Sequence, residues 1–322
     1  MSIFRTFLKG VVALTFFTTP TMAQTYPNRP ITMIVSYPAG GANDIVARSV
    51  GEKMSAKLGQ AIIIENVGGG GGTIGAARAA RADPDGYTLF MAAGAHALAP
   101  SLYKSLPYDL IADFKPISRV ASSSYLVALH PSVPVNTVPE LIAYAKANPG
   151  KLNFASSGIG APPHLAGVLF QQLTGTQLVH IPYKGDTPAL TDLLGGQVQL
   201  AFIAVSATKT HIEAGRLKAL AVTDSVRTEV FPDMPTLDEA GVKGYALSTW
   251  WGLLAPKGTP DAVIRIMHEA VIDALKDTAV VKRFAELGLK PVGSSPQEFA
   301  AVLQTEIKKY ADIAKAAGVT AQ

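Results

Sequence analysis

Glycines, an amide and a carboxylate at the start of a helical pattern suggest where this chain could bind an anion. The turn Gly40-Gly41 follows an apolar run that ends near Tyr37, and Asn43 and Asp44 come directly after it. The first N–H groups of a helix have no partner inside the helix, and together with the helix dipole they attract negative charge. An ordinary turn before a helix capped by Asn43 or Asp44 has the same pattern, so the turn alone leaves both interpretations open.

Two further stretches have helix-start signals of the same kind. Ser156-Ser157-Gly158 follows an apolar run and precedes Pro162-Pro163, and proline favours the first turn of a helix. Farther along, Asp186 or Thr187 is predicted to cap a helix ahead of Pro188. If two such helix starts face each other from separate lobes, they form a clamp suited to a carboxylate.

Other chemistries find little support. The chain has no cysteine, which excludes disulfides, thiolate nucleophiles and cysteine metal sites. Gly70, Gly72 and Gly75 match a dinucleotide motif, but the next strand ends without the acidic residue that this motif needs. The Gly-x-Ser-x-Gly motif of hydrolases is absent, and no two of the six histidines have metal-ligand spacing. No cofactor and no metal are expected.

Two aromatic positions admit two interpretations each. His164 lies in the first turn of a predicted helix, where it could contact a ligand or play a hydrogen-bonded structural role. Trp250, with its neighbour Trp251, is expected to pack a long strand, and lining a cleft is the alternative.

Apolar β-branched runs alternate with helical patterns over most of the chain, which predicts an α/β fold with parallel sheets. Two longer strand-like runs, residues 114–131 and 245–256, interrupt the alternation, and three helical segments close the chain. We therefore predict two lobes joined by two crossing strands. Lobe one comprises residues 24–123 and 246–322, and lobe two comprises residues 124–245. Ligand sites at the carboxyl ends of strands in two such lobes would face one another across a cleft.

The N-terminus predicts export. Arg5 and Lys9 precede a short apolar run, and Thr21-Met22-Ala23 ends the segment as a signal-peptide cleavage site does. Residues 1–23 are therefore predicted to be removed, and the mature chain would begin at Gln24 and carry a charge of about +2. With 48% hydrophobic and 16% charged residues and no cluster of like charges, the chain is expected to be globular and not to bind nucleic acid.

Several motifs in this order resemble one family over nearly the whole mature chain. They are YPNRPITMIVSYPAGGANDIVAR, LGQAIIIENVGGGGGTIGA, ADPDGYTLF, PGKLNFASSGIGAPPHLAG, HIPYKGDTPALTDLLGGQV and WWGLLAPKGTP. The sequence is similar to the substrate-binding receptors of tripartite tricarboxylate transporters, the Bug family of periplasmic proteins. The resemblance implies a two-lobed periplasmic-binding-protein fold of the type II kind. It also implies a monomer in the periplasm that binds a small carboxylate without chemistry and delivers it to membrane permease subunits.

The resemblance also implies which residues hold the ligand. The loop after the first strand would grip a carboxylate through backbone amides, a second loop would grip it from lobe two, and the glycine loop and a crossing-strand serine would form further walls. The residues implied are Tyr37, Ala39, Gly40, Gly41, Asp44, Gly71, Gly72, Thr73, Ser123, Ser156, Gly158, Ala161, His164 and Ile203.

Three residues depart from the pattern common in this family. Many members have Asp at the position of Ile203, Thr at that of Ala161 and Glu at that of Val168. The first two changes remove polar groups from the expected cleft, and Phe202 and Trp250 could add ring contacts beside Tyr37. A carboxylate without an amino group is therefore the expected ligand. An exported hydrolase-like enzyme that uses the serines at 122–124 or 156–157 with His164 is the alternative function.

Overall fold

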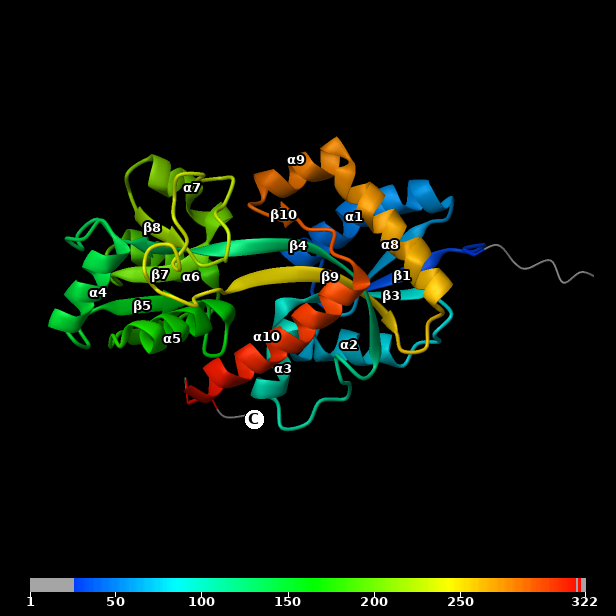
Figure 1. The fold of residues 1–322 in the computed structure, drawn as a ribbon, viewed down its shortest axis with the longest axis horizontal. Coiled ribbons are helices and arrows are strands. Elements are labelled where there is room, and N and C mark those ends of the chain that lie inside the picture. Colours follow the sequence, from blue (N-terminus) through cyan, green and yellow to red (C-terminus); the bar gives the residue numbers. More distant parts are fainter. Residues whose placement is uncertain (1–25, 317, 320–322) are drawn as a thin grey trace, which may run out of the picture.

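The computed structural model describes residues 26–316 and 318–319 and arranges them in two lobes (Figure 1). Lobe one holds the first strands together with the last helices, and lobe two holds the middle of the chain. The predicted two-lobed α/β fold is confirmed. The predicted signal peptide, residues 1–23, lies outside the described residues.

In lobe one, three parallel strands end at the same edge of the sheet. Val35 pairs with Asn66 on one side and with Met91 on the other, so the loops after all three strands leave side by side. The strands of lobe one are β1 (Ile31–Val35), β2 (Ile62–Asn66), β3 (Thr88–Ala93), β9 (Ser248–Pro256) and β10 (Lys290–Pro291). The helices are α1 (Ala42–Leu58), α2 (Thr73–Ala80), α3 (Gly94–Leu102), α8 (Asp261–Lys276), α9 (Thr278–Glu286) and α10 (Pro296–Ala316), with a short 3-10 helix η1 (Gly70–Gly72) before α2.

The sheet of lobe one is buried on both faces. Met33 contributes to the core shared with α1 and α8, whereas Ile34, the next residue, contributes to the core shared with α2, α3 and α10. This alternation explains why the run ITMIV reads as continuously apolar, because both faces of the strand are covered by helices.

Lobe two repeats this arrangement on a smaller scale. Ser156 and Pro182 pair at the carboxyl ends of two parallel strands, and the loops of this lobe begin there. The strands are β5 (Asn153–Ser156), β6 (Val179–Pro182), β7 (Leu200–Ala204) and β8 (Lys218–Val222). The helices are α4 (Val138–Ala147), α5 (Pro162–Thr174), α6 (Asp186–Leu194) and α7 (Val205–Glu213).

Two long strands connect the lobes. Figure 1 shows β4 (Phe114–Leu129) and β9 running side by side between them. β4 pairs with β9 from Phe114 to Ser124 and with β7 from Tyr125 to Leu129, so one strand belongs to both sheets. Both crossing strands are antiparallel to their neighbours, whereas β1–β3 and β5–β7 have the predicted parallel pairing. The lobe boundaries at 123/124 and 245/246 stay predictions.

Helix α10 packs against both lobes. It contacts α3 in lobe one and α5 in lobe two. Phe299 of α10 lies edge-on against Trp250 of β9, with ring centroids 5.4 Å apart. Trp250 is 1% exposed, so its predicted role in packing the crossing strand is confirmed and it does not line a cleft. Among the described residues, no helix has the length and apolar character that a membrane span requires.

Candidate functional site

The loop after β1 leads into α1 without a side-chain cap. Gly41 is the residue before the helix, and no side chain accepts a hydrogen bond from the amides of the first turn. The predicted cap, Asn43 or Asp44, is wrong, because both residues lie inside the helix. The Asn43 amide donates to the carbonyl oxygen of Met91 at 3.1 Å instead. The start of α1 therefore offers N–H groups to an external acceptor.

Asp44 holds this loop in shape. Its carboxylate accepts hydrogen bonds at 2.9 Å from three groups: the backbone amide of Gly40, Nε of Arg48 and the side-chain amide of Asn66. Burial acts to raise the pKa of Asp44, but these hydrogen bonds outweigh it and hold the pKa below its ordinary value. The amide of Gly40, one of the predicted ligand donors, is thus already used by the chain.

The glycine loop lies beside the first loop. Tyr37 donates from its hydroxyl to the carbonyl oxygen of Gly71 at 3.3 Å, and Tyr103 donates to that of Gly70 at 3.1 Å. Gly72 has a φ of +98°, and a Cβ there would lie 2.9 Å from Nε2 of His96 and 3.0 Å from the Tyr37 hydroxyl. Glycine is required at this position, because a side chain would push the loop away from both rings.

His96 connects the first loop to the start of α3. Its Nε2 lies 2.9 Å from the Ser36 hydroxyl, and its Nδ1 lies 3.0 Å from the backbone amide of Ala93. Burial lowers the pKa of His96 to about 4, so the ring is neutral at neutral pH. Burial, followed by the effect of neighbouring Tyr103, raises the pKa of Tyr37 to about 12.

The loop of lobe two begins at Ser156 and ends at the start of α5. The helix begins at Pro162 with Ala161 before it and no side-chain cap. Proline has no N–H group, so Pro162 and Pro163 remove two donors from the first turn, and the amide of Leu165 is already bonded to Ala161. This helix start therefore has fewer amides for an anion than the predicted clamp requires, and the His164 amide is the one left in its first turn.

The predicted cap of the third helix start is wrong. α6 begins at Asp186 itself, with Gly185 before it and no side-chain cap. Gly185 has a φ of +109°, which favours glycine over the side chains that usually cap a helix.

The loop of lobe two approaches helix α3 of lobe one. A Cβ on Gly160 would lie 2.9 Å from the side chain of Leu102, and Leu102 precedes Tyr103, which holds the glycine loop. The loop at 156–164 therefore approaches α3, which in turn holds the glycine loop, and the predicted joint grip of these loops on a ligand stays a prediction.

Three other residues expected at the cleft lie elsewhere. Ser123 donates to the carbonyl oxygen of Gly288 at 3.1 Å, beside β10. Ile203 is 2% exposed and belongs to the core of lobe two. Phe202 is 1% exposed, so the expectation that its ring contacts a ligand is wrong in this structure, because alternate residues of β7 point into the two cores.

Ser156 and His180 are in contact as a nucleophile and a base would be, but their surroundings do not suit catalysis. The Ser156 hydroxyl lies 2.6 Å from Nε2 of His180, yet Ser156 is 2% exposed and also bonds the backbone of Gly158. In the described part of the chain no carboxylate hydrogen-bonds His180, so nothing orients a base. Across the same residues, no group of three acidic or histidine side chains could hold a metal.

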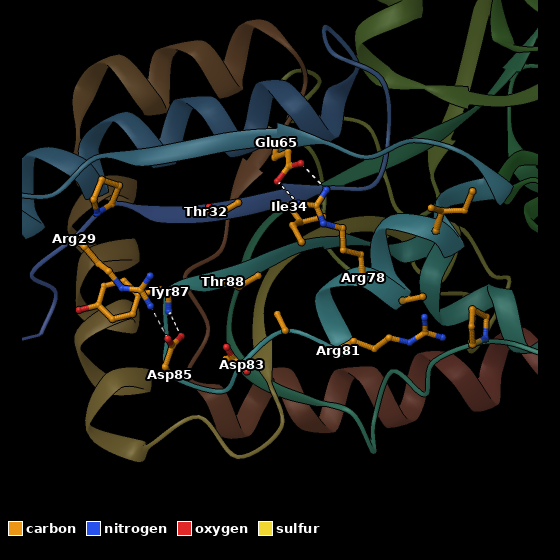
Figure 2. Close-up of a pocket in the computed structure, with 15 residues that line it drawn as sticks. Arg29, Thr32, Ile34, Glu65, Arg78, Arg81, Asp83, Asp85, Tyr87 and Thr88 are labelled. Carbon is orange, nitrogen blue, oxygen red and sulfur yellow. Dashed lines mark hydrogen bonds and ion pairs between the residues drawn. The ribbon is translucent and has the colours of Figure 1, made fainter.

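A surface hollow of about 840 Å³ lies at the other end of lobe one, beside the amino ends of β1 and β3 (Figure 2). It contains three arginines, but two of them are neutralised. Arg78 forms a two-point ion pair with Glu65, and Arg29 pairs with Asp85 at 2.7 Å. The third arginine is Arg81, and the hollow lies at the opposite ends of the strands from the unpaired amides of α1.

Comparisons with known proteins agree with the resemblance. Residues 46–319 match the model of the tripartite tricarboxylate transporter family receptor. The structure of the periplasmic binding protein BugD is 39% identical, with a TM-score of 0.72, and the match covers 92% of this chain and 100% of BugD. Rpa4515 from R. palustris, solved with adipate, is 33% identical, with a TM-score of 0.75 and coverage of 92% and 100%. MatC from Rhodopseudomonas palustris, solved with bound malate, is 33% identical, with a TM-score of 0.70 and coverage of 89% and 99%.

Proposed function

This chain belongs to the tripartite tricarboxylate transporter receptor family, and we propose that it binds a small organic carboxylate between its two lobes and delivers it to a membrane permease. The protein is a solute-binding receptor and not an enzyme. Solved relatives that hold adipate and malate support a carboxylate as the ligand class.

The uncapped start of α1 is the observation that carries the proposal. Its amides follow Gly41 at the carboxyl end of β1, and the side chain that could have competed for them, Asp44, is turned back onto Gly40. Each hydrogen bond between an amide and a carboxylate contributes about 1.5–3 kcal/mol, so a few of them would account for a micromolar dissociation constant, about −8 kcal/mol.

The second loop would complete the site. The 156–164 loop already touches α3 through Gly160 and Leu102, which supports a ligand position between the two lobes. The start of α5 contributes mainly its dipole and one amide, so we expect most hydrogen bonds to the carboxylate to come from lobe one. Closure of the lobes on the ligand would be the signal that the permease reads.

We further propose that the ligand has no amino group. An ammonium group in a closed cleft requires an acceptor, because an unpaired buried charge costs several kcal/mol. Asp44 is the one acidic member of the predicted ligand-binding set, and its carboxylate is already bonded by Gly40, Arg48 and Asn66. Ala161, before the start of α5, has no side-chain acceptor to replace it.

The proposed location and partners follow the family. We propose export to the periplasm by the segment at residues 1–23 and docking of the closed receptor, as a monomer, on permease subunits of a tripartite tricarboxylate transporter. The family assignment and the sequence pattern of that segment support this.

A thermal-shift screen tests the proposal. The protein is first unfolded and then refolded, so that it carries no ligand into the screen. The panel contains adipate, malate, benzene and pyridine carboxylates, glutamate and aspartate. A ligand at 100 times its dissociation constant stabilises the native state by about 2.7 kcal/mol, which raises the unfolding midpoint. We expect a rise with at least one carboxylate that lacks an amino group. A rise with glutamate or aspartate alone would contradict the ligand class, and no rise with any compound would contradict carboxylate binding.

A further inference from the structure

Three nearly parallel rings pack together beside the loop of lobe two. Phe154 on β5 pairs in register with His180 on β6, and their ring centroids are 4.9 Å apart. His164, in the first turn of α5, stacks on His180 with centroids 3.9 Å apart and planes 18° from parallel, and its ring centroid lies 6.3 Å from that of Phe154. The stack therefore joins two strands and the helix that follows the loop.

Each imidazole holds one end of the same loop. Nε2 of His180 lies 2.6 Å from the hydroxyl of Ser156, which also accepts from the amide of Gly158 at 3.2 Å. Nδ1 of His164 accepts from the amide of Gly160 at 3.1 Å. Between these contacts, the carbonyl oxygens of Ser157 and Gly158 accept from the amides of Gly185 at 3.3 Å and Ala161 at 3.2 Å. Gly158 and Gly160, with φ values of +142° and +76°, have no side chains to hold the loop.

We propose that His180 and His164 form a stacked pair of positioning residues that fix the loop at 156–160 in the shape required to grip the ligand from lobe two. This inference rests on the proposed function of that loop. His180 is not expected to touch the ligand, because its Nε2 is occupied by Ser156. It acts through Ser156 and through the ring of His164.

The arrangement requires a neutral His164 and favours a neutral His180 beside it. Nδ1 of His164 can accept the Gly160 amide only when it carries no proton, and two imidazolium rings at 3.9 Å would repel each other. Burial lowers the pKa of His164, and burial followed by the neighbouring His164 lowers that of His180 to about 4, in keeping with a neutral pair.

Paired variants separate positioning from general stability. His180→Leu removes the hydrogen bond and the aromatic stack, whereas His180→Gln can return an amide to the position of Nε2. His164→Phe keeps a ring without an acceptor, whereas His164→Asn can return an acceptor near the position of Nδ1. His130→Leu is the matched control, because His130 also lies in lobe two and also bonds a serine but does not contact this loop. Its Nδ1 lies 2.8 Å from the hydroxyl of Ser132.

Two measurements are compared: hydrogen–deuterium exchange of residues 156–164 without ligand, and calorimetric affinity for adipate and malate. We expect His180→Leu and His164→Phe to speed exchange and weaken binding by about tenfold, or about 1.4 kcal/mol. His180→Gln and His164→Asn should recover most of the wild-type exchange protection and affinity. His130→Leu should change neither the exchange nor the affinity. Folded His180→Leu and His164→Phe proteins with wild-type exchange and affinity would overturn the inference. If the wild-type protein binds neither compound, the exchange of the ligand-free loop still decides the role of the pair.

Discussion

Gly41 is the residue of the first loop that best tests whether the start of α1 receives the ligand. Its φ of −76° suits any residue, and the nearest atom to an added Cβ is the carbonyl oxygen of Pro38 at 3.5 Å. Gly40, in contrast, has a φ of +83°, so a side chain there would strain the backbone and confuse loss of binding with loss of loop structure.

We predict that Gly41→Val weakens carboxylate binding about tenfold or more, or by about 1.4 kcal/mol. The branched side chain would stand between the ligand and the first amides of α1, while the fold is kept. Calorimetry with the tightest-binding compound of the panel measures the change. Gly195→Val is the control, because Gly195 has a φ of −81°, is exposed at the end of α6, and offers an added Cβ the same 3.5 Å approach to one carbonyl oxygen. Equal affinity of the Gly41 variant and the control would place the anion elsewhere.

The lowered pKa of Asp44 predicts that the folded protein loses stability at acidic pH. Its pKa is lower in the folded than in the unfolded chain, so its stabilising effect is complete above the unfolded value of about 4 and is lost as the pH falls through the lower folded value. Asp44→Asn removes this loss. The unfolding midpoint of the variant should therefore fall less than that of the wild type between about pH 5 and about pH 3. Parallel profiles of the two proteins would show that the three hydrogen bonds to Asp44 add no net stability.

At the scale of elements, periodicity predicted most strands and helices because the buried strands of both lobes are continuous apolar runs. The long strands were predicted within three residues, since β4 and β9 remain strand-like where they leave one sheet for the other. β10 was missed because it has two residues, too few for any period.

Helix starts and side-chain pairs were predicted less well. Which residue precedes the first turn of a helix depends on a shift of one to three residues, as at Gly41 and Gly185. Two contacts depend on the register between strands that are far apart in the sequence. Asn66 hydrogen-bonds Tyr37 and Asp44 of the first loop, and His180 lies opposite Phe154. A polar residue within an otherwise apolar run was the available signal for both.

The contact between β9 and α10 gives a prediction at this scale. A Cβ on Gly252 would lie 2.1 Å from the ring of Phe299, which is fully buried. Gly252→Ala should lower the free energy of unfolding by about 1–3 kcal/mol through overpacking, measured by urea unfolding. Gly195→Ala, where the same added methyl group meets no such contact, should change it little. A Gly252→Ala protein as stable as this control would mean that α10 can shift freely on the crossing strands.

At the scale of the whole molecule, α10 is a third connection between the lobes. It contacts α3 in lobe one and α5 in lobe two. Any closure of the lobes must therefore preserve or exchange contacts of α10 as well as bend β4 and β9.

The N-terminal segment gives a prediction about the mature protein. Arg5 and Lys9, the apolar run and Thr21-Met22-Ala23 predict cleavage after Ala23. Intact mass of the protein recovered from the periplasm should correspond to a chain that begins at Gln24. Full-length chain recovered in the membrane fraction would contradict removal of the segment.

Calorimetric titration of ligand-free protein, with recovery of the ligand afterwards, tests the central claim most directly. A receptor that binds one small carboxylate between its lobes should release heat until one ligand is bound per chain, and mass spectrometry should then find the ligand unchanged. Heat that continues beyond one equivalent while the ligand is consumed, or no saturable binding by any carboxylate of the panel, would contradict the account.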